Sequence, residues 1–158
     1  LLALLCSRAR SWNEFGGVLK QVLPVLLATL VAVLGLAVAM GAVRPDLKLS
    51  QLTMQFIAVN LFFTVVAEEA FFRGFLQHRL AAALARRPSG QWIAVACSAL
   101  LFGAVHLPGG AAYALLATVA GVGYAYAYHL TRRIEAPILL HIALNAIHFA
   151  AFSYPALR

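Results

Sequence analysis

The hydrophobic positions of this chain form long continuous runs, and short polar segments separate them. Residues 22–43 and 111–130 are each close to the roughly 20 apolar residues that a helix needs to cross a bilayer. Shorter apolar runs cover residues 92–107 and 137–152. The pattern therefore predicts several membrane-spanning helices that are joined by short polar turns.

A longer helix is expected over residues 51–85, with Ser50 as the residue that caps its first turn. At about 1.5 Å per residue, such a helix is much longer than the roughly 30 Å hydrocarbon core. It must therefore bend, tilt strongly or leave the membrane. We expect this to happen at Gly74, with an interfacial continuation after it.

The chain before the first span mixes basic residues with aromatic residues. Residues 7–21 include Trp12 and Phe15, which predicts an interfacial segment with an aromatic anchor. Pro24 is expected in the first turn of the following span, where proline is tolerated. Together these patterns predict an all-α polytopic bundle of about five spans plus this segment, forming one membrane-embedded domain over residues 1–158.

The composition supports this assignment, because 63% of the residues are hydrophobic and only 11% are charged. The formal net charge of +7 is interpreted as a signal of orientation, since basic residues collect in cytoplasmic loops. The sequence contains no basic patch with interleaved aromatic residues, so nucleic-acid binding is not expected. Cys6 and Cys97 are expected to be free buried thiols.

Basic residues predict that the N-terminal side lies in the cytoplasm. With this topology, eight basic residues lie inside and three outside. The inside residues are Arg8, Arg10, Lys20, Arg79, Arg86, Arg87, Arg132 and Arg133, and the outside residues are Arg44, Lys48 and Arg158.

Two of the five acidic residues, Glu68 and Glu69, are adjacent and follow the uncharged residues 52–67. A charge inside a span costs about 2.5–3.5 kcal/mol on insertion scales, so such residues are usually functional. Glu69 and Arg73 are four residues apart and can pair on one helix face. Glu68 is rotated by about 100° from Glu69 and is left to face something else. A purely structural ion pair explains Glu69 and Arg73 but leaves Glu68 unexplained.

Two further apolar helices carry isolated polar residues. His106 lies near the end of one, and a single stripe of the other carries His141, Asn145 and His148. Polar groups in a dry interior must satisfy one another, so we expect them to converge with Glu68. Straight helices place these groups at depths that differ by up to about 20 Å. Strong tilts, a bend near Gly74 or water-filled re-entrant segments are expected to close that gap.

Three segments together resemble the motifs of one family. Residues 68–73 resemble a Glu-Glu-x-x-x-Arg motif, residues 102–106 a Phe-x-x-x-His motif, and residues 141–145 a His-x-x-x-Asn motif. In this order on hydrophobic helices, they are similar to the CAAX-protease and bacteriocin-processing group of intramembrane glutamic endopeptidases. That group includes the prenyl-protein endopeptidases. The resemblance covers roughly residues 60–155, within a motif-bearing core of about 51–155.

The resemblance implies a role for each motif residue. Glu68 would be the general base, acting on a water molecule that it shares with His106. His141 and Asn145 would donate hydrogen bonds to the tetrahedral oxyanion. The remaining expected site residues, which hold or support these groups, are Glu69, Arg73, Phe102 and His148.

The resemblance also implies the partners of the protein. The substrate would be a membrane-anchored protein or peptide, cut near its C-terminus at a prenylated CAAX-like sequence or a sorting signal. We expect a multi-pass protein of the bacterial inner membrane that contacts lipid and uses neither metal nor cofactor. The sequence does not predict an oligomeric state.

Other functions fit some of the same residues. Glu68 and three histidines could bind zinc in a metalloprotease, although the sequence has no His-Glu-x-x-His helix. A non-catalytic membrane scaffold or bacteriocin immunity protein would keep the polar groups as a structural network. A small transporter is less expected, because the sequence shows no inverted repeat of broken helices.

Overall fold

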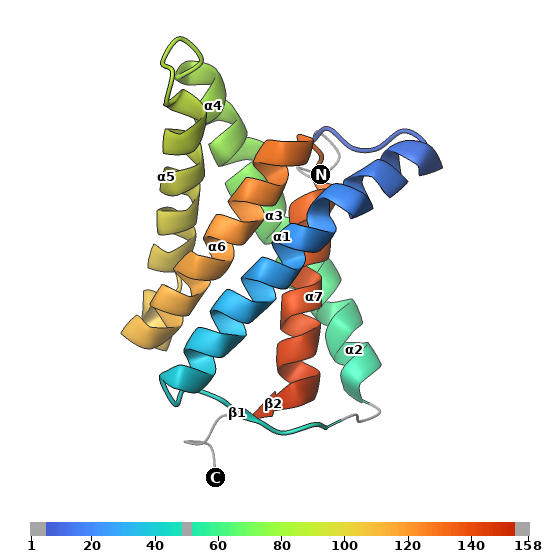
Figure 1. The fold of residues 1–158 in the computed structure, drawn as a ribbon, viewed down its shortest axis with the longest axis vertical. Helices are drawn as coiled ribbons and strands as arrows, with labels where there is room; N and C mark the ends of the chain where they lie inside the picture. The colour runs from blue at the N-terminus through green and yellow to red at the C-terminus, as the bar shows by residue number, and fades with distance from the viewer. Residues whose placement is uncertain (1–5, 49–51, 154–158) are drawn as a thin grey trace.

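The computed structural model describes residues 6–48 and 52–153, and these residues are predominantly helical (Figure 1). The predicted all-α class is confirmed. The long helical segments of the described chain are α1 (Trp12–Ala39), a continuous run over Leu52–Ala83, α5 (Gly90–Ala104), α6 (Ala111–Thr131) and α7 (Glu135–Ala151). The expectations for Ser50 and Arg158 lie outside the described residues.

Three of these segments, α1, Leu52–Ala83 and α6, are long and apolar enough to cross a membrane. The other two are apolar but shorter, with 15 residues in α5 and 17 in α7. Both are below the roughly 20 residues of a span perpendicular to the bilayer. By length and composition, the described chain therefore has three clear spans where the pattern predicts about five.

The first helix begins earlier than predicted. Ser11 caps α1, because its hydroxyl oxygen accepts a hydrogen bond from the Glu14 amide at 3.2 Å. The segment that was expected to lie at the interface is thus the start of a 28-residue helix, and Pro24 lies in the helix interior rather than in the first turn. Figure 1 shows α1 changing direction after its first turns, as is typical of a helix with an interior proline.

The run Leu52–Ala83 crosses the bundle diagonally, and π-helical turns interrupt its α-helical geometry (Figure 1). From its start it consists of α2 (Leu52–Val59), η2 (Asn60–Val65), α3 (Val66–Glu69), η3 (Ala70–Gln77) and α4 (His78–Ala83). The acidic pair therefore lies in the short α-helical part between two π-helical segments, which are frequent at functional sites.

Gly74, where a bend or an exit from the membrane was expected, lies in a π-helical segment and has a packing role. The helical run continues through it within η3. A Cβ atom at Gly74 would collide with Sγ of Cys6. Neither Cys6 nor Cys97 is part of a disulfide, as predicted, but both are only partly buried.

Small residues in α6 allow neighbouring helices to pack closely against it. A Cβ atom at Gly121 would lie 3.2 Å from backbone atoms of Ala99 in α5. A Cβ atom at Gly123 would collide with the side chain of Thr29 in α1. α6 is thus held closely between α5 and α1.

The helices are offset along the bundle, and this offset closes the expected gap in depth. In Figure 1 the turn between α4 and α5 extends beyond the start of α7, whereas α7 reaches further than α5 at the opposite end. His106 lies just after α5, at the start of the short 3₁₀ helix η4 (Leu107–Gly109), and not within a span as predicted. The end of α5 is therefore level with the middle of α7 (Figure 1).

The two ends of the bundle are tied by hydrogen bonds. At the end that carries the N-terminal segment, the Ile134 amide donates to the Ser7 carbonyl at 2.9 Å. At the other end, β1 (Arg44–Pro45) pairs antiparallel with β2 (Phe152–Ser153). This pairing holds the connection after α1 against the end of α7.

The packing of α1 on α6 gives a test with a matched control. Gly123→Ala is expected to lower the melting temperature by several degrees, because overpacking against the β-branched Thr29 typically costs about 1–3 kcal/mol. Gly35→Ala, where a Cβ atom meets nothing within 4 Å, should leave the melting temperature unchanged or raise it. Thermal unfolding of the detergent-solubilised protein measures both, and equal values would contradict this packing.

Candidate active site

The predicted pair of Glu69 and Arg73 is confirmed and lies at the centre of the bundle. Both side chains have 0% exposure, and Arg73 Nη1 donates to Glu69 Oε1 at 3.1 Å. Arg73 Nη2 donates to the Gly121 carbonyl of α6, also at 3.1 Å. The guanidinium group lies 4.6 Å from the centre of the Phe102 ring. These extra contacts offset part of the cost of removing two charges from water.

Glu69 also fixes the orientation of His141 on α7. Nδ1 of His141 lies 2.7 Å from Glu69 Oε1. Because a carboxylate accepts hydrogen bonds, Nδ1 carries the proton of this contact and Nε2 remains for other partners. The imidazole ring stacks on the Tyr124 ring, with their centres 4.5 Å apart. The His141 ring is therefore held in a single orientation by charge and by packing.

His106 is held in a similar way by the helix that precedes it. Its Nδ1 lies 2.6 Å from the carbonyl oxygen of Phe102. A carbonyl oxygen can only accept, so Nδ1 is the donor and Nε2 is again the free ring nitrogen. Packing against the rings of Phe102 and Tyr113 fixes the plane of His106.

Glu68 differs from its neighbour Glu69. Within residues 6–48 and 52–153, no hydrogen bond or ion pair joins the Glu68 side chain to another residue. The side chain is half-buried and lies within electrostatic reach of His141 and His106. Two adjacent carboxylates thus have different surroundings: Glu69 contacts Arg73 and His141, whereas Glu68 has no such contact in the described chain.

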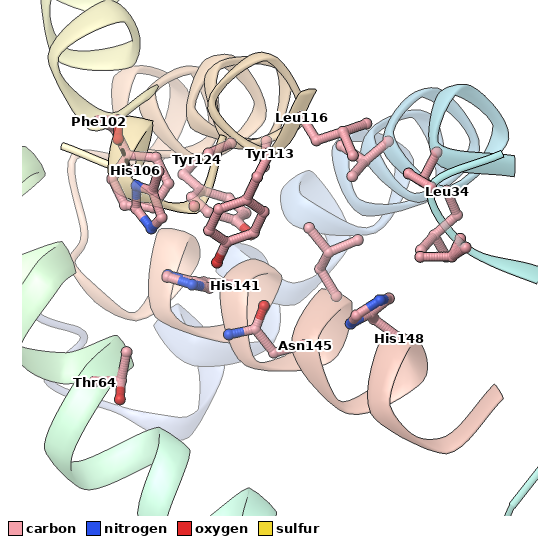
Figure 2. Close-up of a pocket in the computed structure, with 18 of the residues that line it drawn as sticks. Leu34, Thr64, Phe102, His106, Tyr113, Leu116, Tyr124, His141, Asn145 and His148 are labelled. Carbon is pink, nitrogen blue, oxygen red and sulfur yellow. Dashed lines mark hydrogen bonds between the residues drawn. The ribbon is translucent and has the colours of Figure 1, made fainter. Parts of the chain in front are cut away.

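A cavity of about 400 Å³ brings the predicted polar residues together. Figure 2 shows side chains from α5, α6 and α7 arranged around it, with Thr64 of η2 on the opposite side. The predicted residues that line the cavity are Glu68, Phe102, His106, His141, Asn145 and His148. Glu69 and Arg73 do not line it, because they are fully buried behind His141.

Asn145 has a partner that the sequence analysis missed. Its Nδ2 donates to Oδ1 of Asn60 at 2.9 Å, which ties α7 to the π-helical segment η2. Asn60, Thr64 and Glu68 follow one another at intervals of four residues and all line the cavity. This spacing, which places residues on one helix face, is the signal that could have identified Asn60.

Tyr113 is a second residue that the sequence analysis missed. It lies in the first turn of α6, and Figure 2 shows its hydroxyl directed toward His141 and Asn145. A Cβ atom at Gly109 would collide with its ring, so the missing side chain at Gly109 makes room for Tyr113. A tyrosine that follows a Gly-Gly turn resembles an ordinary packing or membrane-interface residue, so the sequence carries no distinctive signal for it.

The remaining histidines are distributed differently. His148 lines the same cavity, at the end where Figure 2 shows Leu34. His78 and His129 do not line it. The Tyr128 hydroxyl contacts His78 Nδ1 at 3.3 Å, and the His129 ring packs against Trp92.

Among the described residues, no group of three or more His, Cys, Asp or Glu side chains is placed to hold a metal ion. Glu68, His106 and His141 instead line one side of a cavity that is large enough to hold water or a peptide group. This geometry does not favour the zinc metalloprotease hypothesis.

Comparison with known families gives one match. A family model described as type II CAAX prenyl endopeptidase Rce1-like matches residues 50–147. No curated protein and no solved structure matches the chain. The matched residues include every motif from the acidic pair to Asn145 and exclude α1.

The buried ion pair predicts a large effect on stability. Arg73→Met should destabilise the fold by about 3–5 kcal/mol, because it leaves the buried Glu69 carboxylate without its partner charge. Arg79→Met, at an exposed position one and a half turns further along, should change stability by less than about 0.5 kcal/mol. Thermal unfolding and unfolding in denaturing detergent measure the stability of the two variants. Similar losses of stability in both would contradict this account.

Proposed function

Because this chain belongs to the Rce1-like family of type II CAAX prenyl endopeptidases, we propose that it is a glutamic intramembrane endopeptidase. Membership in a protease family identifies the chain as a peptidase, and helices apolar enough to span a membrane identify it as a membrane protein. Its substrate is a membrane-anchored protein or peptide that is cut near its C-terminus. One observation carries the proposed mechanism. Glu68 has no hydrogen-bond or ion-pair partner in the part of the chain that the structure describes, and it shares a cavity with two histidines whose Nδ1 atoms are already engaged.

In the proposed reaction, a water molecule lies between Glu68 and His106. Nε2 of His106 accepts a hydrogen bond from one water hydrogen, while the Glu68 carboxylate removes the other hydrogen as a proton. The water oxygen then forms a bond to the carbonyl carbon of the substrate. The engaged Nδ1 of His106 supports this assignment, because it leaves Nε2 as the nitrogen that can face the water.

The carbonyl oxygen of the substrate becomes an oxyanion that hydrogen-bond donors stabilise. Asn145 has a second Nδ2 hydrogen for this contact beyond the one that it donates to Asn60. His141 can donate from Nε2 only as an imidazolium, since its Nδ1 hydrogen already bonds to Glu69. The Glu69 carboxylate stabilises that cation. The carbon–nitrogen bond then breaks, and the proton held by Glu68 passes to the leaving amine.

The distribution of basic residues supports a proposal for the orientation of the protein in the membrane. The N-terminal segment, the α4–α5 turn and the α6–α7 turn lie at one end of the bundle (Figure 1). Arg132 donates to Gln91, and Arg133 donates to the Arg8 carbonyl, so basic residues are concentrated there. We place this end in the cytoplasm of a bacterium, with the protein in the inner membrane.

The first functional test removes the proposed base. Glu68→Gln is expected to abolish cleavage of a lipidated or sorting-signal peptide while the melting temperature stays within a few degrees of the wild type. Glu14→Gln removes a carboxylate near the start of α1, outside the cavity, and should retain activity. Full activity in Glu68→Gln would rule out Glu68 as the base. Retained biological activity without any cleavage would favour the scaffold or immunity function.

A second test concerns Asn60, which we assign as a positioning residue for Asn145. Asn60→Leu removes the acceptor of the 2.9 Å hydrogen bond and should lower kcat about tenfold with little change in KM. Asn60→Asp keeps an acceptor oxygen and should recover most of that loss. If both variants lost the same activity, Asn60 would contribute packing and not orientation.

A further inference from the structure

The proposed oxyanion site has few hydrogen-bond donors in Asn145 and His141. Asn145 retains one Nδ2 hydrogen after its bond to Asn60. His141 donates from Nε2 only in its imidazolium form, since its Nδ1 hydrogen bonds to Glu69. While His141 is neutral, these two residues therefore offer a single hydrogen to the charge that develops on the carbonyl oxygen. A further donor at this place would add to the stabilisation of the oxyanion.

Tyr113 lies across the cavity from these two residues. It belongs to the first turn of α6, whereas His141 and Asn145 belong to α7. All three line the cavity, and Figure 2 shows the Tyr113 hydroxyl directed toward the other two. A phenol is protonated at neutral pH and can donate its hydrogen in a hydrogen bond. The two oxyanion residues and this hydroxyl therefore face the same part of the cavity.

The Tyr113 hydroxyl has no hydrogen-bond partner within residues 6–48 and 52–153. The Tyr113 ring makes an edge contact with the His106 ring, with the two centres 5.3 Å apart. By contrast, the hydroxyl of Tyr128 on the same helix contacts His78 Nδ1 at 3.3 Å. A hydroxyl without such a contact bonds to water or to a ligand. The Tyr113 hydroxyl is thus a donor for a molecule that enters the cavity.

The turn before α6 determines where Tyr113 lies. The side chain is exposed, so its position depends strongly on the backbone that carries it. Gly110 begins α6 with a φ of +100°, a conformation that favours glycine. The Gly109 amide donates to the His106 carbonyl at 3.0 Å, and a Cβ atom at Gly109 would collide with the Tyr113 ring. The two glycines therefore fold the chain so that Tyr113 lies against His106.

The proposed base lies near the same hydroxyl. Glu68 interacts electrostatically with Tyr113, and it also interacts with His106 and His141. Peptide hydrolysis needs a base for the attacking water and donors for the carbonyl oxygen. Glu68 and Tyr113 line one cavity and supply one group of each kind.

We propose that Tyr113 is a third donor to the oxyanion, beside Asn145 and His141. This inference rests on the proposed function and adds a catalytic residue to its site. Tyr113 keeps its proton, so the proton that Glu68 removes from water still passes to the leaving amine. Because the phenol donates whether His141 is neutral or charged, it stabilises the oxyanion in both states.

The test removes only the hydroxyl. Tyr113→Phe keeps the ring that packs against His106 and Gly109, so the melting temperature should stay close to that of the wild type. The probe is a peptide with a prenylated cysteine near its C-terminus, presented to the full chain in liposomes. Its kcat should fall about 10²-fold with little change in KM, because the donor acts on the transition state.

A matched control makes the same change elsewhere on the same helix. The Tyr126 ring stacks on Trp92, with centres 6.0 Å apart, and it does not line the cavity. Tyr126→Phe should therefore keep the wild-type kcat. A loss of kcat as large as that of Tyr113→Phe would show that removal of any α6 hydroxyl disturbs the enzyme, and it would contradict the proposal.

A tetrahedral analogue gives a second measurement that needs no turnover. In this analogue a phosphinate replaces the peptide bond that the wild type cuts, so an anionic oxygen stands in for the oxyanion. Tyr113→Phe should bind the analogue about 10²-fold more weakly than the wild type does. Binding of the uncut peptide, measured in the Glu68→Gln background, should be the same with and without Tyr113→Phe.

The outcomes separate this inference from the proposed function. A kcat in Tyr113→Phe close to the wild-type value, or a loss confined to KM, would overturn the role of Tyr113. Equal binding of the analogue by Tyr113→Phe and wild type would also overturn it, while cleavage by the wild type would still support a peptidase. If the wild type does not cut the peptide, the proposed function fails and the inference fails with it.

Discussion

The structure depends on the carboxylate of Glu69, which contacts both the Arg73 guanidinium group and the His141 imidazole. Glu69 receives Arg73 from the next turn of its own helix and His141 from α7, while Arg73 reaches on to a carbonyl of α6. Three helices are thereby joined at a point with no exposure to solvent. The desolvation of these charges is costly, and it is offset only while every partner is present. We infer that this network sets the register of α7 against the acidic helix.

The same network explains why two adjacent glutamates can differ in function. Helix geometry turns Glu68 away from the ion pair, into the cavity that holds His106 and Asn145. Glu69 is committed to structure and orients His141, and Glu68 is left with no protein partner in the described chain. π-Helical turns lie on both sides of the pair. In the proposed mechanism, one carboxylate organises the site and the other performs the chemistry.

The sequence predicts the features that depend on local spacing. Glu69 and Arg73 pair because they are four residues apart on one helix face. The sequence does not predict the features that depend on packing between distant parts of the chain. The offset between α5 and α7, which brings His106 to the level of His141, depends on packing that no local pattern encodes. Pro24 lies in the interior of α1 because the helix already begins after its cap at Ser11, and Asn60 is hidden from sequence reasoning inside an apolar run.

The most direct test of the account is the tautomer of His141, read from ¹⁵N NMR of histidine-labelled protein in lipid. The His141 signal is the one that disappears in the His141→Gln variant. The account predicts that this signal shows a protonated Nδ1 in a strong hydrogen bond. It also predicts that the signal shifts in the Glu69→Gln variant. Such a spectrum would place Nε2 in the cavity, available to the substrate. A His141 signal with an unprotonated Nδ1, or one that Glu69→Gln leaves unchanged, would contradict it.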